Sequence, residues 1–370
     1  MGVIFGSMLL LVILSGFAGL KTFTLSYVSS IDPDFKIFPK TGKRILVTQE
    51  QLNKLDTNAN IASYSKIVEE KVFLEFKGTT ELATIKGVDA NYINTVPIDS
   101  SLTLGQWLTP QSFETVMGEL LAYKLKLGVF DFDNLKLIVP KPGKSQSIKK
   151  LISTELAKNV GQISVNDVYN NEYVFSSIEF AQKLLSFDGN TITNIEFKTI
   201  PNIDEALFRE ELNTIFNNSV TIKNKAQLND AIHKMLNTEN IAVYLIFTLI
   251  LIIAMFNLIG SIIMMIIDKK QDLIVLSNLG TPIKDIKQIF FLQGVSLTFI
   301  GGTLGVLLGV LLVGSQLIFE FIKIPGTALT YPVELNIMNI LLVMLTIYTL
   351  GIIASKIASY RISKKMLNVK

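Results

Sequence analysis

Cysteine is absent from this chain of 370 residues, and histidine occurs once, at His233. The first absence excludes thiol chemistry, and the two together exclude a zinc site of cysteine and histidine. A catalytic triad is also not expected, because His233 lies on a polar helix face just before an apolar run, where it is expected to be solvated or capping. The central acidic residues occur singly, without a paired-carboxylate or calcium-loop pattern. The chain is therefore not expected to be an enzyme.

A phosphate-binding loop is lacking as well. Gly143-Lys144-Ser145 resembles the end of such a loop, but the position five residues before Gly143 is Ile138, where the pattern needs glycine. No helix-forming run follows at once, so a turn after Pro140 and Pro142 is expected. The chain is thus predicted to bind no ATP by this route, and no metal or cofactor.

Charge is missing from four long stretches. No Asp, Glu, Lys or Arg occurs in residues 1–20, 241–267, 289–319 and 335–355. About 20 apolar residues at 1.5 Å per residue match the roughly 30 Å thickness of the hydrocarbon core of a bilayer. These stretches therefore predict four transmembrane helices.

The first stretch could also be a secretory signal. It lacks a basic start, its apolar run is too long, and Ser15 to Gly19 is a poor cleavage site. A retained helix is expected. This helix begins at Met1 without the usual cytoplasmic flanking residues, so the natural start of the protein is expected upstream.

Between the first two stretches lies a segment with soluble composition. Residues 21–238 contain 24 Lys/Arg and 25 Asp/Glu, so the overall charge of +3 is no sign of nucleic-acid binding. The predicted fold is an α-helical membrane protein with four transmembrane helices and a large α+β extracytoplasmic, or periplasmic, domain inserted between helices 1 and 2. The predicted boundaries are residues 1–22 for helix 1, 23–238 for the domain, and 239–370 for a permease region with helices at about 241–267, 289–318 and 335–356.

The inserted domain mixes strand and helix patterns. Residues 71–77 and 81–88 predict a β-hairpin, and residues 135–139 and 193–200 predict further strands. Helical spacing occurs in the following segments: residues 118–127, residues 177–185 with Ser177 as the cap, residues 204–217, and residues 227–239 leading into the second span.

Lysine and arginine set the expected orientation. The segment between the second and third spans carries Lys269, Lys270, Lys284 and Lys287, and residues 356–370 carry five cations and no acid. The loop between the third and fourth spans has only Lys323. Cations gather on the cytoplasmic side, so the inserted domain is predicted to lie outside.

A short amphipathic helix is predicted at about 270–280, on the cytoplasmic side. Leu273, Leu276 and Leu279 form one helical stripe near Asp272, Gly280 can end the turn, and Pro282 can begin the next helix. It could rest on lipid headgroups, or it could couple to a cytoplasmic partner by docking its apolar stripe in a groove.

Three glycines of the third span, Gly301, Gly305 and Gly309, recur every four residues on one helix face. Such a row permits close approach of a neighbouring helix. It could form a moving interface between spans or protomers, or a static packing seam.

Several blocks resemble a known family. Residues 254–261, 268–280 and 289–294 resemble the lipoprotein-releasing permeases of the LolC/LolE type, within the FtsX-like permeases of ABC transporters. Blocks of the inserted domain follow the family order: residues 87–89, 118–122 with 127–128, 137–140 and 180–184. The chain departs where the family has a longer N-terminal lead, and where Ser277-Asn278 replaces a basic-plus-small pair.

The resemblance implies an inner-membrane subunit that pairs with a second permease, either the same chain or a paralogue, and with a cytoplasmic dimer of ABC ATPase subunits that hydrolyse ATP. The complex would extract lipoproteins and pass them to a periplasmic carrier. Alternatives are an FtsX-type permease that transmits motion to a cell-wall hydrolase, and a membrane-anchored periplasmic scaffold.

The resemblance also suggests residue roles by position. Leu14, Phe17, Tyr244 and Phe247 would face a lipid cavity, or be ordinary packed or lipid-facing side chains. Pro140, Lys141, Pro142, Gly143 and Lys144 lie where a carrier-recruiting loop occurs in one family subunit, or form a plain solvated turn.

Overall fold

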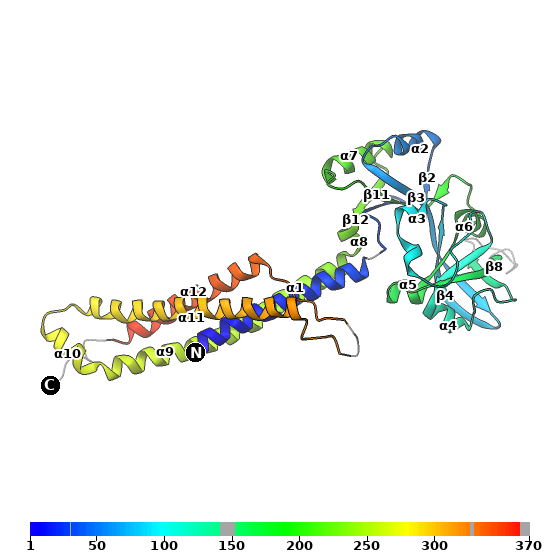
Figure 1. Ribbon diagram of the computed structural model, residues 1–370. Helices are drawn as coiled ribbons and strands as arrows, with labels where there is room; N and C mark the ends of the chain where they lie inside the picture. The colour runs from blue at the N-terminus through cyan, green and yellow to red at the C-terminus, as the bar shows by residue number, and fades with distance from the viewer. Residues whose placement is uncertain (30, 141–151, 326–328, 363–370) are drawn as a thin grey trace. The chain divides into compact units, whose positions relative to one another are not determined.

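The computed structural model describes residues 1–29, 31–140, 152–325 and 329–362 (Figure 1). The chain folds into two compact units. The membrane unit comprises Met1–Leu25 with Ala231–Lys370, and the α+β unit comprises Ser26–Asp230.

The membrane unit is built from long apolar helices. Among the described residues, four helices are long and apolar enough to cross a membrane: α1 (Gly2–Val28), α9 (Asp230–Asp268), α11 (Ile283–Phe319) and α12 (Ile337–Tyr360). The four predicted spans are therefore confirmed, and the chain is a multi-pass membrane protein. The short helix α10 (Lys270–Asn278) lies at the turn between α9 and α11 (Figure 1).

Local chemistry explains why α10 is short. Gly280 has a φ of +91°, a conformation that glycine adopts without steric cost. The backbone N–H of Gly280 donates to the carbonyl of Ser277, and that of Thr281 donates to the carbonyl of Leu276. Pro282 follows as the N-cap of α11. Gly280 and Pro282 thus separate the two helices.

The α+β unit contains the strands and the shorter helices. Its strands are β1 (Phe35–Pro39), β2 (Ile45–Leu46), β3 (Ile61–Phe76), β4 (Thr79–Val88), β5 (Leu102–Gly105), β6 (Glu114–Gly118), β7 (Leu135–Pro140), β8 (Ile152–Ile163), β9 (Tyr173–Ser177), β10 (Thr191–Ile192), β11 (Asn194–Thr199) and β12 (Val220–Asn224). Its helices are α2 (Gln49–Asp56), α3 (Tyr92–Thr95), the 3-10 turn η1 (Ile98–Ser101), α4 (Glu119–Leu125), α5 (Asp167–Glu172), α6 (Ile178–Leu185), α7 (Glu205–Ile215) and α8 (Lys225–Leu228).

One strand organises the sheet. The strand order is β12-β1-β11-β3-β4-β9-β6-β8-β5, and β7 pairs with both β3 and β8. This double pairing closes a ring of strands, β3-β4-β9-β6-β8-β7. The first half of β3 pairs instead with β11, which extends the sheet away from the ring. The long strand β3 therefore belongs to both parts of the unit.

Most predicted elements of this unit are present. The β3–β4 hairpin turns through Lys77 and Gly78, both with positive φ. Helix α6 begins after Ser177, whose side chain caps the backbone N–H of Phe180. The predicted helix at 227–239 differs, because α8 ends at Leu228 and α9 starts at Asp230.

Four charged side chains are enclosed where β1, β11, β3 and β4 lie side by side. The Nζ of Lys86 lies 2.8 Å from Glu196 Oε1, and both side chains are at most 2% exposed. Lys36 Nζ lies 3.0 Å from Glu196 and 3.0 Å from Glu69. The Tyr173 hydroxyl donates to Glu69 at 2.9 Å. Each cation thus meets a carboxylate within the sheet.

This pairing governs the protonation of the acids. Burial by itself raises the pKa of Glu69, but the charges of Lys36 and Lys86 and hydrogen bonds from Lys36 and Tyr173 outweigh it and lower the pKa to about 2. The pKa of Glu196 is also lowered, because Lys86 and Lys36 outweigh its burial. Burial raises the pKa of Asp32.

We predict that Glu196→Gln destabilises the α+β unit by about 3–5 kcal/mol, because Lys86 stays buried without its charged partner. Trp107 is the single tryptophan and packs 5.5 Å from Phe175, centroid to centroid, so its fluorescence reports unfolding of this unit in the whole protein. Glu50→Gln is the control, because it breaks an exposed pair with Lys54. Equal denaturation midpoints for both variants would contradict the prediction.

We also predict that acid weakens this unit. A carboxylate with a lowered folded pKa contributes stability above its usual value of 4.5, and this contribution is lost as pH falls toward about 2. Glu69 and Glu196 act in this sense, and Asp32 acts in the opposite sense. The free energy of unfolding, followed by Trp107, should fall between about pH 5 and pH 3. The fall should be smaller in Glu69→Gln, and an unchanged pH dependence in that variant would refute the assignment.

Candidate functional site

The glycine row of α11 packs against α1. A Cβ placed at Gly301 would lie 3.5 Å from Val3, and one placed at Gly309 would lie 3.1 Å from Leu11. A Cβ at Gly305 would collide with the Ser7 hydroxyl and the Ile4 carbonyl. The row therefore forms a seam with the first helix of the same chain.

Small residues also join α11 to α12. A Cβ on Gly294 would collide with Ser355, one on Gly302 would lie 2.9 Å from Ile347, and one on Gly351 would collide with Thr298. The Oγ atoms of Ser355 and Thr298 bond carbonyls of their own helices, so neither is left unsatisfied. Helix α11 thus holds α1 on one face and α12 on another.

The C-terminal half of α1 is also held in place by hydrogen bonds. The backbone N–H of Glu334 donates to the carbonyl of Ser15 at 3.0 Å. The Thr22 hydroxyl donates to the Glu334 carboxylate at 2.7 Å, and Lys21 donates to Asn237 at 2.8 Å. These bonds fasten α1 to the segment before α12 and to α9.

Helix α10 divides its leucine stripe between two environments. Leu273 is 4% exposed and packs with Ile266 of α9, Phe290 of α11 and Ala358 of α12. Leu276 is 37% exposed and Leu279 is 77% exposed. The expectation that all three leucines form one docking surface needs this correction: Leu273 is an anchor to the bundle.

The remaining predicted residues of this segment lie at its surface. Asp272 is exposed, and its carboxylate lies 3.3 Å from the Nζ of Lys269. Gly280 forms the exposed turn after α10. Their role toward a partner stays a prediction.

Three of the residues expected at a lipid cavity meet in one cluster. Leu14 of α1 is 2% exposed and packs with half-buried Tyr244 and Phe247 of α9. The Tyr244 hydroxyl lies 2.7 Å from the Thr346 hydroxyl of α12. Leu14 is therefore a packed side chain within this chain, and the lipid-cavity role of the four residues stays a prediction. Phe17 is half-buried on α1.

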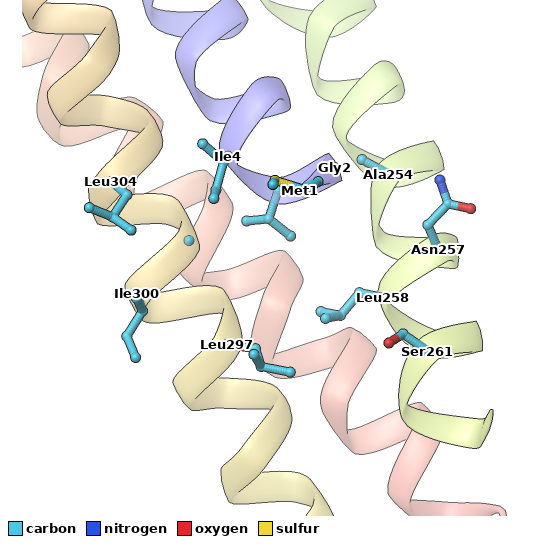
Figure 2. Close-up of a pocket in the computed structure, with 12 residues that line it drawn as sticks. Met1, Gly2, Ile4, Ala254, Asn257, Leu258, Ser261, Leu297, Ile300 and Leu304 are labelled. Atoms are coloured by element: carbon cyan, nitrogen blue, oxygen red, sulfur yellow. The ribbon is translucent and has the colours of Figure 1, made fainter. Parts of the chain in front are cut away.

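A different cavity, of about 380 Å³, opens between α1, α9 and α11 (Figure 2). Apolar side chains of α11, including Leu297, Ile300 and Leu304, form one wall. Helix α9 supplies Ala254, Asn257, Leu258 and Ser261, and the first residues of α1 complete the lining. The sequence reasoning missed this cavity, although the spacing of the α9 residues (i, i+3, i+4, i+7) marks one helix face.

The expected carrier-recruiting loop is described only at its edge. Pro140 is the exposed last residue of β7 and pairs with Ile152 at the start of β8. Lys141, Pro142, Gly143 and Lys144 lie outside the described residues. The loop role stays a prediction.

The membrane unit matches a known protein family. The model of the FtsX-like permease C-terminal region matches residues 244–367, which contain α10, α11, α12 and most of α9. This part of the chain is an FtsX-like permease domain. The resemblance to FtsX-like permeases that the sequence blocks predicted is thereby confirmed over this region.

Curated relatives extend the similarity beyond this domain. LolC of Buchnera aphidicola subsp. Schizaphis graminum, a lipoprotein-releasing system transmembrane protein, is 22% identical over 301 residues, which cover 80% of this chain and 73% of that protein. LolE of Haemophilus influenzae is 21% identical over 392 residues, which cover 98% and 90%. Among solved structures, the periplasmic region of MacB from Actinobacillus actinomycetemcomitans covers 56% of this chain and 95% of that chain, at 14% identity and a TM-score of 0.39.

We predict that Gly305→Val separates α1 from α11 and destabilises the membrane unit by at least about 1–3 kcal/mol, because the added methyl groups have no space. Gly314→Val on the same helix is the matched control, because no atom lies within 4 Å of a Cβ placed there. The measurement is the temperature at which half of the detergent-solubilised protein is lost from the monodisperse peak. Equal temperatures for the two variants would show that the seam adds no stability.

Proposed function

We propose that this permease extracts lipoproteins from the inner membrane and passes them to a periplasmic carrier, driven by a separate ABC ATPase. The observation that carries the proposal is the match to LolE over 98% of this chain, which includes the α+β unit as well as the permease domain. A second lipoprotein-releasing relative matches over 80% of the chain.

The energetics of this task require an external source of work. Each acyl CH₂ that leaves lipid costs roughly 0.8 kcal/mol, so an acylated protein does not leave the bilayer spontaneously. In the proposal the ATPase supplies the work from the cytoplasm, and a second permease, either this chain or a paralogue, completes the apolar path. The α+β unit lies in the periplasm and shields the acyl chains on their way to the carrier.

Helix α10 is suited to receive the motion of the ATPase. Leu276 and Leu279 expose apolar surface, while Leu273 ties the same helix to α9, α11 and α12. Docking an amphipathic helix in a groove is a common mode of protein recognition. The cations near this end of the bundle favour a cytoplasmic position.

The proposal is tested by reconstitution. The permease is purified together with the ABC ATPase that associates with it, and the complex is placed in vesicles that hold a radiolabelled triacylated lipoprotein. Addition of ATP and purified carrier should release the label, while a non-hydrolysable ATP analogue should not. Release no greater than with the analogue, despite ATP hydrolysis, would refute lipoprotein extraction.

We predict that Leu276→Asp lowers lipoprotein release at least about tenfold, because losing one buried leucine contact removes about 1.5–3 kcal/mol of docking energy. The complex should remain inserted in the membrane, since Leu273 still anchors α10. Gln271→Asp is the matched control: it adds the same charge to exposed α10 surface, about 140° around the helix. Full release by Leu276→Asp would remove the coupling role from this surface.

A further inference from the structure

A second pocket, of about 570 Å³, lies between α11 and α12, where Ile283 begins α11 shortly after α10. Helix α11 contributes Lys284, Lys287 and Phe291, which recur at helical spacing. Helix α12 contributes Ile352 and Lys356 at the same spacing. Each helix therefore lines the pocket with both lysine and apolar side chains.

The polarity of the pocket changes along the helices. At 1.5 Å per residue, Phe291 lies about 6 Å further into the span than Lys287. Ile352 likewise lies about 6 Å further into the span than Lys356. The pocket thus has a cationic mouth near the helix ends and an apolar floor toward the middle of the span.

The mouth of the pocket is lined by lysines. No carboxylate lines the pocket, and in the described part of the chain none of Lys284, Lys287 and Lys356 forms an ion pair. Asp285 follows Lys284 in the first turn of α11, but it is not among the residues that line the pocket. An anion is the missing partner.

The surroundings of the pocket identify the source of the anion. Exposed apolar side chains occur beside the lining residues on both helices, at Ile289 and Leu292 of α11 and at Ile353 and Ile357 of α12. These side chains are suited to lipid, and a soluble phosphate compound would leave the floor of Phe291 and Ile352 empty. An amphipathic ligand fills both parts.

We propose that this pocket binds an anionic glycerophospholipid. The phosphate lies among Lys284, Lys287 and Lys356, and one acyl chain follows Phe291 and Ile352. The Lys287 Nζ stands 5.1 Å from the centre of the Tyr360 ring, so this aromatic face helps to hold one cation at the mouth. Basic pockets between transmembrane helices are known to take such headgroups.

The test measures retained lipid on the full chain. Permease purified in detergent is incubated with equal amounts of phosphatidylglycerol and phosphatidylcholine, and native mass spectrometry counts the bound lipid. Wild type should retain phosphatidylglycerol in preference, and the double variant Lys287→Gln/Lys356→Gln should lower this preference at least about fivefold. The pair Lys287→Arg/Lys356→Arg keeps both charges and should restore it, which separates loss of charge from misfolding.

Two controls distinguish this pocket from diffuse surface charge and from a soluble phosphate site. Lys270→Gln removes an exposed charge near the same end of the bundle without touching the pocket, so it should retain the wild-type preference. Glycerol phosphate in excess should not displace the lipid, because it leaves the apolar floor unfilled.

Four outcomes would overturn the proposal. Equal retention of the two lipids would show no headgroup selection, and an equal effect of Lys270→Gln would show only diffuse surface charge. Displacement by glycerol phosphate would mark a soluble phosphate site. If the double variant keeps phosphatidylglycerol but loses co-purification of the ATPase, the lysines contact that protein and not lipid.

Discussion

The membrane unit depends on the close approach of α11 to its neighbours. Inside a bilayer the hydrophobic effect does not drive helices together, because lipid tails are as apolar as the side chains. Transmembrane helices therefore associate through close packing and hydrogen bonds. Gly301, Gly305 and Gly309 provide this packing toward α1, and Gly294 and Gly302 provide it toward α12. The chain inserts about 200 residues between α1 and α9. The seam therefore joins parts of the membrane unit that are far apart in sequence.

The α+β unit solves a different problem. Strand β4 is buried from Ala83 to Val88, so Lys86 cannot reach water and needs an acid within the sheet. Glu196 of β11 supplies it, and Glu69 with Lys36 balances the remaining charge. Such a network is stabilising only when every member is paired, because each unpaired buried charge is costly. The charges thus tie β1, β3, β4 and β11 to one arrangement.

Sequence reasoning found what depends on local pattern. The four spans follow from uninterrupted apolar length, and the β3–β4 hairpin and the Ser177 cap follow from neighbouring residues. It did not find the ring closed by β7, because strand pairing over long distances leaves no local pattern. Sequence reasoning also missed that Lys86 is buried and paired with Glu196, because a single lysine in a strand usually lies on the solvated face of the sheet.

The leucine stripe of α10 shows the same limit at the candidate site. Helical spacing placed Leu273, Leu276 and Leu279 together, but spacing cannot tell which side faces the bundle. The structure assigns Leu273 to the bundle and leaves the other two exposed. The glycine seam had two readings, and the contact with α1 of the same chain favours packing within one subunit.

These features give α10 a physical basis for transmitting motion. In the proposed coupling, a force on Leu276 or Leu279 would pass to Leu273 within one short helix, and Leu273 packs with residues of α9, α11 and α12. Helix α11 would pass the displacement to α1 in this proposal, because the glycine seam brings their backbones into close contact. Densely packed interiors transmit strain without absorbing it. In the chain, α1 precedes the α+β unit and α9 follows it. Both helices belong to the packed bundle that contains α10.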